Sequence, residues 1–255
     1  MNQAGAVRLA IDGPVATLLL DRPAKRNALS SNMIEELRNR LVELSGNDQV
    51  RVVLVRASGD RAFCAGADTE EFRHTSPEDI RGIWTRTGQQ VFTALAELPQ
   101  TTIAVLSGSA YGGGLELALH CDFRVAAPGI EIGLPEATLG TTPGWSGLTR
   151  VVALAGIPAA RMLAMTGRAA SARRAYEWGL VDLVTEDLES TLQKMVSSIL
   201  GTGVVAQSIV KRLLAHSEPN SSSTAQLVDS LAGAYTAACG ETAQFLNNAA
   251  ERRSQ

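Results

Sequence analysis

Two apolar, largely β-branched runs, at residues 50–55 and 102–106, constrain the fold more than any other feature of this chain. Strands buried on both faces have this composition, which is typical of parallel sheets covered by helices. Helical patterns lie on either side of the first run: one follows a predicted cap at Ser30, and a longer one covers 77–98. Strands that alternate with helices up to about residue 184 predict βαβ units and a parallel sheet.

The two ends of the chain differ from this alternating centre. Residues 7–11 and 15–20 flank Asp12-Gly13-Pro14, which predicts a hairpin at the start. After residue 184 the pattern is helical only, with helices expected at 187–200, 203–215 and 223–250. We therefore expect an α/β core over 1–190 and a helical C-terminal module over 191–255.

Composition excludes several classes of function. The chain has 255 residues, of which 45% are hydrophobic and 19% charged, which fits a globular protein of one or two domains. A net charge of −3 and few aromatic residues give no sign of a nucleic-acid partner. Three scattered cysteines and no metal-like spacing of histidine and cysteine argue against disulfides and a metal site. Without a secretory signal or a membrane-length apolar segment, the expectation is a soluble, cytoplasmic protein.

A glycine turn follows the apolar run at 102–106. Gly112, Gly113 and Gly114 open a helical pattern there, and Glu116 lies in its first turn. Backbone N–H groups at a helix start lack partners within the helix, so they can hold a developing negative charge. Glu116 is therefore either a partner of the helix dipole or a catalytic carboxylate. The glycine spacing matches neither nucleotide-binding motifs nor a serine-nucleophile elbow.

A second turn of small residues, Phe63 to Asp68, follows the run at 50–55, and a second carboxylate, Glu136, lies beside a glycine-rich segment at 140–147. Small side chains let a ligand approach the backbone closely. Two such turns with two carboxylates predict a site that stabilises an oxyanion and moves protons beside it. Arg22 and Lys25 lie in a polar loop, which is either simply solvated or a cationic lip for an anionic ligand.

Four motifs now carry a resemblance, which extends along almost the whole chain. They are DRPAKRNALS (21–30), FCAGAD (63–68), GSAYGGGLELALHCD (108–122) and GLPEATLGTTPGWSG (133–147), with looser matches at 162–168 and 175–184. In this order and at these spacings the sequence resembles the enoyl-CoA hydratase/isomerase (crotonase) family. The resemblance implies a spiral of ββα units with a helical C-terminal trimerisation module, in a homotrimer or homohexamer.

The resemblance also implies the ligand and the site. Family members bind an acyl-CoA thioester, so CoA is part of the substrate and no separate cofactor is implied. The thioester oxygen would be held by the backbone N–H groups of Ala67 and Gly113. Contacts with the substrate or with CoA are further implied for these residues: Arg22, Lys25, Ala65, Asp68, Gly112 and Trp145. Asp68 has a second interpretation, as the cap of the helix that follows it.

Glu116 and Glu136 indicate the reaction, because hydratases of this family carry two glutamates twenty residues apart at these places. By resemblance Glu116 activates water and Glu136 protonates the α-carbon, which predicts syn hydration of a trans-2-enoyl-CoA to a 3-hydroxyacyl-CoA. The alternatives are an enoyl-CoA isomerase, a hydratase-lyase for aromatic enoyl-CoA, and a non-catalytic family member. Trp145 stands where small residues are common in the family, and we expect it to reshape the acyl pocket.

Overall fold

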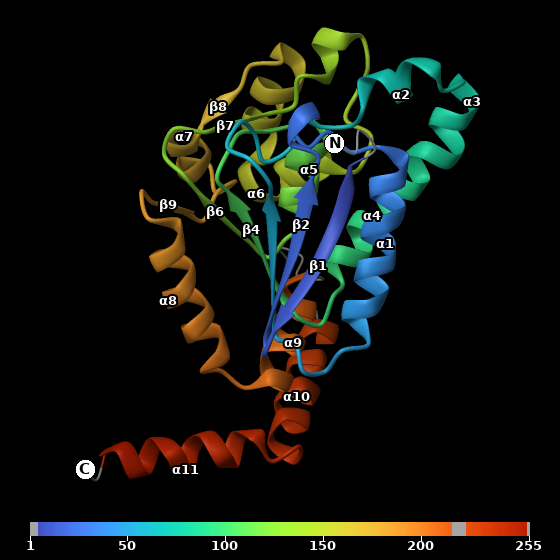
Figure 1. The fold of residues 1–255 in the computed structure, drawn as a ribbon. Coiled ribbons are helices and arrows are strands. Elements are labelled where there is room, and N and C mark those ends of the chain that lie inside the picture. Colours follow the sequence, from blue (N-terminus) through green and yellow to red (C-terminus); the bar gives the residue numbers. More distant parts are fainter. Residues whose placement is uncertain (1–4, 216–222, 254–255) are drawn as a thin grey trace. The chain divides into compact units, whose positions relative to one another are not determined.

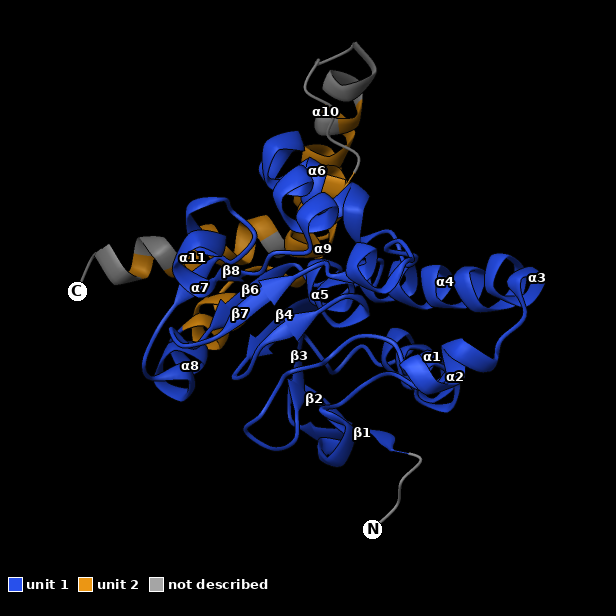
Figure 2. Ribbon diagram, turned by 90° about the horizontal axis from the view of Figure 1, so that it is seen from above, with its two compact units in different colours: residues 1–194 blue, residues 195–255 orange. Residues whose placement is uncertain are grey.

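A computed structural model describes residues 5–215 and 223–253. The chain divides into two compact units, Met1–Lys194 and Met195–Gln255, which are coloured separately in Figure 2. Helix α8 (Leu188–Leu200) runs across this division, and the boundary expected at 190–191 falls within the same helix.

The larger unit is built on a six-stranded sheet with the order β1-β2-β3-β4-β6-β9. β1 and β2 form the predicted antiparallel hairpin, and every later pair in this sheet is parallel, as predicted. All six residues of β4 are buried, which confirms the interpretation of its apolar run. The strands are β1 (Ala6–Asp12), β2 (Val15–Asp21), β3 (Val52–Ala57), β4 (Thr101–Leu106), β6 (Phe123–Ala126) and β9 (Leu183–Val184).

A smaller sheet was not predicted as a unit. It joins β5 (Ala110–Tyr111), β7 (Glu131–Gly133) and β8 (Ala170–Ser171) in the order β5-β7-β8. Strands of two or three residues are too short to show the alternation by which strands are recognised in a sequence. This sheet holds the glycine turn in place, because the N–H of Gly112 donates to the carbonyl of Gly133 at 2.9 Å.

Helices α1 (Ser31–Ser45) and α4 (Thr85–Ala96) lie side by side against the large sheet (Figure 1). Ser30 caps α1 as predicted, since its side chain accepts a hydrogen bond from the N–H of Met33 at 3.3 Å. The helix predicted over 77–98 is observed as α3 (Pro77–Asp79), a π-helical segment η2 (Ile80–Trp84) and α4. The π-helical turn is a local irregularity of a kind often found at functional sites.

Short elements connect these layers. They are η1 (Pro23–Lys25), α2 (Thr69–His74), α5 (Gly113–Leu119), η3 (Glu136–Leu139) and α7 (Ala172–Glu177). α5 is buried along its whole length. Figure 1 shows α5 at the end of the sheet to which the arrowheads of the central strands point. This end is where ligands bind in open parallel sheets.

One expectation about apolar segments is wrong. α6 (Gly147–Ala160) continues into a π-helical segment, η4 (Arg161–Met165), and the combined run is long and apolar enough to cross a membrane by length and composition alone. The non-helical backbone of Gly156 (φ 76°) kinks this run and divides it into two helical parts, and Pro158 follows the kink.

The smaller unit contains the end of α8 followed by α9 (Val204–Ala215), α10 (Ser223–Ala238) and α11 (Glu241–Arg253). The single helix predicted over 223–250 is therefore two helices, which separate at Gly240 with a left-handed φ of 80°. The helical character expected of the C-terminal region is confirmed. Its expected role in trimerisation stays a prediction.

Candidate functional site

The two glycine turns and the loop after β7 enclose one cavity of about 340 Å³. This volume is near the lower end of the range for small-molecule sites. The cavity brings together seven of the residues that sequence analysis selected: Ala65, Ala67, Gly112, Gly113, Glu116, Glu136 and Trp145. Arg22, Lys25 and Asp68 do not line it.

Two backbone N–H groups meet at one wall of the cavity. A side chain built at Gly113 would place its Cβ 3.4 Å from the nitrogen of Ala67, so the two turns lie in contact. Gly66 (φ 107°) and Gly112 (φ 50°) precede these two residues and adopt left-handed backbone that other residues avoid. Among the residues that the structure describes, neither the Ala67 nor the Gly113 N–H has an acceptor.

Glu116 is held rigidly although it is almost fully buried, with 2% of its surface exposed. One oxygen, Oε1, accepts hydrogen bonds from the N–H groups of Trp145 at 2.8 Å and Gly147 at 2.7 Å. The residue between these donors, Ser146, is left-handed (φ 73°), and this conformation directs both N–H groups at one oxygen. Oε1 is therefore fixed by the backbone, and a further backbone hydrogen bond from Gly144 also favours the ionised carboxylate.

Burial raises the pKa of Glu116 to about 7, and the nearby charge of Glu136 also raises it, against the opposing effect of the Gly147 and Trp145 N–H groups. Behind the carboxylate, Nδ1 of His120 lies 2.7 Å from the backbone oxygen of Glu116. Burial lowers the pKa of His120 to about 4, so its ring is neutral at pH 7 and supplies no positive charge to Glu116.

Glu136 begins η3 on the opposite side of the glycine turn. A Cβ at Gly112 would lie only 2.9 Å from Oε1 of Glu136, so this carboxylate rests against the turn itself. Oε2 is buried and has no hydrogen-bond partner among the described residues. Burial raises the pKa of Glu136 as well. The site thus holds two carboxylates that favour the protonated state more than ordinary glutamates do.

Trp145 forms a wall of the cavity and is 2% exposed. The edge of its ring lies close to Gly113, since a Cβ atom at position 113 would be only 2.5 Å from the ring. Phe92 packs against the Trp145 ring edge-on at 5.2 Å, and Trp84 packs against it at 4.5 Å. Whether Trp145 contacts a substrate stays a prediction, but its place beside the Gly113 N–H fits an acyl pocket.

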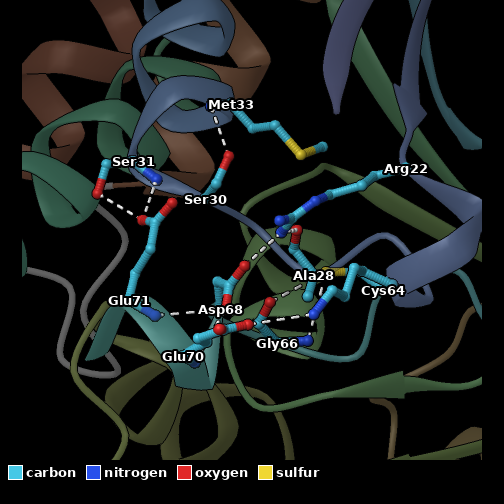
Figure 3. A network of polar contacts seen from close by, with 11 residues as sticks. Arg22, Ala28, Ser30, Ser31, Met33, Cys64, Gly66, Asp68, Glu70 and Glu71 are labelled. Carbon is cyan, nitrogen blue, oxygen red and sulfur yellow. Dashed lines mark hydrogen bonds and ion pairs between the residues drawn. The ribbon is translucent and has the colours of Figure 1, made fainter. Parts of the chain in front are cut away.

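Arg22 requires a correction. The cationic lip would need a solvent-facing guanidinium, but Arg22 is only 8% exposed and points inward to Asp68 (Figure 3). Its Nη1 lies 2.6 Å from Oδ2 of Asp68 and also donates to the carbonyl of Ala28. The side chain is therefore committed to an internal ion pair, because a buried cation is costly unless it is paired.

Asp68 caps α2, as one of its two interpretations predicted. Its Oδ1 accepts hydrogen bonds from the N–H groups of Glu70 and Glu71. Glu71 in turn accepts from the N–H and the hydroxyl of Ser31, and this tie to α1 is visible in Figure 3. These contacts fix the turn that carries the Ala67 N–H. A contact of Asp68 with CoA stays a prediction.

Lys25 remains accessible, unlike Arg22. Its side chain is 49% exposed and its Nζ lies 3.2 Å from Oε2 of Glu70, which is itself 70% exposed. An exposed pair of this kind exchanges easily with other charged groups. The expected contact with a phosphate of CoA stays a prediction for this residue.

Sequence reasoning missed several residues of the cavity, among them Phe72, Arg73, Trp84, Leu139 and Thr142. Trp84 and Val91 are seven residues apart on the predicted 77–98 helix and therefore lie on the same face. This spacing indicates an ordinary core position for Trp84. Arg73 is an exposed cation that lines the cavity, at a place where Arg22 had been expected to lie. No residue of the described chain belongs to a cluster of His, Cys, Asp and Glu that could hold a metal ion.

Known proteins resemble this chain in sequence. The profile of the enoyl-CoA hydratase/isomerase family matches residues 10–238. The chain is 34% identical over 212 residues to a short-chain-enoyl-CoA hydratase of Clostridium acetobutylicum, with 82% of this chain and 80% of that protein covered. It is 40% identical to human enoyl-CoA hydratase domain-containing protein 2, although the match covers 68% of this chain and only 60% of the human protein.

A solved structure shares the fold. The enoyl-CoA hydratase of Bacillus anthracis superposes with a TM-score of 0.91 at 31% identity, with 96% of each chain covered. This likeness confirms the predicted crotonase fold, in which an α/β core is followed by helices. The family profile, the relatives and the fold lead to one conclusion: the chain belongs to the enoyl-CoA hydratase/isomerase family.

Proposed function

We propose that the protein is an enoyl-CoA hydratase, which adds water reversibly to a trans-2-enoyl-CoA and forms a 3-hydroxyacyl-CoA. One observation carries the proposal. Glu116 and Glu136 face a single cavity with raised pKa values, beside two backbone N–H groups that have no acceptor in the described chain. Such a site can exchange protons near neutral pH and can stabilise negative charge at the same time.

The N–H groups of Ala67 and Gly113 would hold the thioester oxygen. When water attacks C3 of the enoyl group, electrons move to this oxygen and an enolate forms. A fixed donor that points at such an oxygen contributes about 3 kcal/mol to catalysis. Backbone donors suit this role because the turns that carry them contain Gly66 and Gly112, which have no side chains and leave space for the thioester.

The two glutamates would share the proton transfers. Ionised Glu116 takes a proton from water as the C3–O bond forms, and protonated Glu136 donates its proton to C2 as the enolate collapses. Both carboxylates act from the same cavity, so water adds to one face of the double bond. Exchange of one proton with solvent then restores the starting state of the pair. Coupled carboxylates of this kind titrate as a pair, so either one can begin the cycle ionised.

The names of the relatives support this proposal at the level of chemistry. The Clostridium protein is named a short-chain-enoyl-CoA hydratase and the Bacillus structure an enoyl-CoA hydratase. The family description also includes isomerases, which move a double bond without adding water. The same two carboxylates could perform that shift, so the first experiment must separate the two reactions.

The test is to incubate the protein with crotonyl-CoA and to follow the ultraviolet absorbance of the enoyl thioester, with mass spectrometry of the product. Hydration removes the absorbance and increases the mass by one water. A second incubation with a 3-enoyl-CoA tests isomerisation, which creates the absorbance at unchanged mass. If the protein isomerises the 3-enoyl-CoA but does not hydrate crotonyl-CoA, it is an isomerase and not a hydratase. If neither occurs with straight, branched or aromatic enoyl groups, the proposal is wrong.

We also propose that the protein assembles as a homotrimer or homohexamer. Several large apolar side chains of α6 are exposed on the isolated chain: Leu148, Val152, Leu154 and Ile157. Exposed apolar side chains of this kind favour association when they gather in one patch. Light scattering of the purified protein measures the mass in solution, and a monomeric mass at micromolar concentration would contradict the proposal.

A further inference from the structure

A second cavity lies behind the wall of the candidate site. It has a volume of about 310 Å³, and its apolar lining includes Leu29, Ile34 and Ile83. Trp84 and Trp145 line this cavity, and both also line the first. The two indole rings therefore stand between two spaces of similar size.

The two rings differ in how firmly they are held. Trp145 is fully enclosed. Phe92 packs on its ring, and Gly88 lies so close to its Nε1 that a side chain at position 88 would collide with the indole. Trp84 is only partly buried, lies in the π-helical segment Ile80–Trp84, and packs edge-on against Phe72 at 5.3 Å. The ring centroids of the two tryptophans are 4.5 Å apart with a tilt of 32°. Trp84 is thus the less enclosed half of this wall.

The wall lies close to the expected position of the thioester. The edge of Trp145 meets the backbone of Gly113, whose N–H is one of the two donors without an acceptor in the described chain. An acyl chain that extends from those donors reaches the indole rings after a few carbons. We propose that Trp84 closes the acyl pocket and selects short acyl groups, and that the second cavity receives the tail of a longer acyl group when the Trp84 ring is absent.

The lining of the second cavity fits an uncharged hydrocarbon tail. Its wall is apolar at Leu29, Ile34 and Ile83, and its charged member, Asp79, is exposed and paired with the hydroxyl of Ser76 at 2.8 Å. A carboxylate at the end of the tail would meet the negative charge of Asp79. The cavity therefore favours a simple alkyl chain over an acidic one.

This inference rests on the proposed function for its ligand, an acyl-CoA, but not on the reaction. Saturated thioesters cannot be hydrated, so binding of butyryl-, octanoyl- and dodecanoyl-CoA by calorimetry tests it separately. We expect the wild type to bind butyryl-CoA more tightly than dodecanoyl-CoA. Trp84→Ala should tighten dodecanoyl-CoA by about tenfold or more, because several more methylenes become buried, and should leave butyryl-CoA within about threefold.

Two further variants make the test specific. In Trp84→Ala/Thr87→Phe, a new side chain at Thr87 fills the second cavity, so the gain for dodecanoyl-CoA should disappear. Trp178→Ala is the matched control, because the third tryptophan lines neither cavity and stacks instead under Arg174 at 4.9 Å. It should not change the order of the three ligands. If Trp84→Ala does not fold by circular dichroism, Trp84→Leu replaces it, with a smaller expected gain.

The outcomes separate the two proposals. A gain for dodecanoyl-CoA that Thr87→Phe does not reverse would show general loosening and would overturn the inference. No gain in a folded Trp84→Ala or Trp84→Leu variant would overturn it as well. If the ligand preference shifts as expected but crotonyl-CoA is not hydrated, the inference stands and the proposed reaction fails. If no acyl-CoA of any length binds, both are wrong.

Discussion

Two neighbouring regions of this molecule bury carboxylates in opposite ways. At the Arg22–Asp68 pair the carboxylate meets a guanidinium at 2.6 Å. At the Glu116–Glu136 pair two carboxylates share one cavity, and Glu116 has only backbone N–H groups as hydrogen-bond donors in the described chain. Ala67 adjoins the first region and lines the cavity of the second, so both regions shape the same turn.

The difference appears in the pKa values. Burial opposes the ionisation of Asp68, but the hydrogen bond and charge of Arg22, together with the N–H groups of Glu70 and Glu71, outweigh burial, so the pKa of Asp68 is lowered. Burial raises the pKa of Glu116 to about 7 because no cation compensates it. A carboxylate that is ionised at neutral pH suits a structural ion pair, whereas one that titrates near pH 7 suits proton transfer. The cost of burying a carboxylate is therefore compensated by a cation in the first region and left uncompensated in the second.

The largest expected effect is the loss of activity when a glutamate of the cavity is replaced. Glu116→Gln and Glu136→Gln keep the shape of the side chain but cannot accept and donate the proton in turn. We expect each to lower kcat for hydration by about 10²–10⁴-fold, while the Kd for a saturated acyl-CoA changes little. Stopped-flow kinetics and calorimetry measure the two quantities. Full activity in either variant would remove that residue from the mechanism.

The next effect concerns stability and the first region. Asp68→Asn keeps a good helix cap but leaves the buried Arg22 without its negative partner. We expect the free energy of unfolding to fall by about 3 kcal/mol. Asp21→Asn is the matched control, because Asp21 pairs with Arg8, whose side chain is 67% exposed, and should lose at most about 1 kcal/mol. Urea denaturation measures both, and equal losses would contradict the comparison.

Glu116 also predicts a pH dependence with a definite sign. Its folded pKa of about 7 lies above the unfolded value of 4.5, so its favourable contribution to stability is complete below pH 4.5 and is lost as the pH rises through 7. Glu116→Gln should therefore match the wild type near pH 4.5 and exceed it by about 3 kcal/mol above pH 8. Asp68 has the opposite sign, since its contribution is lost only as the pH falls through its lowered pKa.

The same titration should appear in catalysis. If ionised Glu116 activates water, kcat/KM for hydration should fall about tenfold for each pH unit below 7. Denaturation curves between pH 4.5 and 9 test the predicted change in stability, and kinetic profiles in the same buffers test the predicted change in kcat/KM. A stability difference between wild type and Glu116→Gln that does not vary with pH would show that burial does not shift this group.

The smallest expected effect concerns the exposed cation. Lys25→Ala should change the free energy of unfolding by less than about 0.5 kcal/mol, because its pair with Glu70 is exposed. If Lys25 contacts a phosphate of CoA, KM should rise about two- to fivefold at low salt and less at high salt. Glu70→Gln frees Lys25 and should not raise KM. Identical KM values for Lys25→Ala and the wild type would remove Lys25 from the predicted binding residues.

Much of the fold could be predicted because its signals are local. The fully buried strand β4 had a nearly continuous apolar run, and the cap at Ser30 with the helical pattern after it predicted α1. The two- and three-residue strands of the second sheet could not be predicted, since their stability comes from neighbours distant in the sequence. The break at Gly240 was missed because one residue in a long helical pattern decides it.

The candidate site divides in the same way. By itself the sequence determined the parallel sheet, the two glycine turns, the two glutamates and the resemblance to a family, because these depend on the kind and order of residues. Tertiary structure alone decided that Arg22 pairs internally with Asp68, that Trp84 meets Trp145, and that the pKa of Glu116 rises to about 7. Charge pairing, ring packing and desolvation depend on which residues meet in space, and residues 46 positions apart in the chain, such as Arg22 and Asp68, meet only in the folded protein.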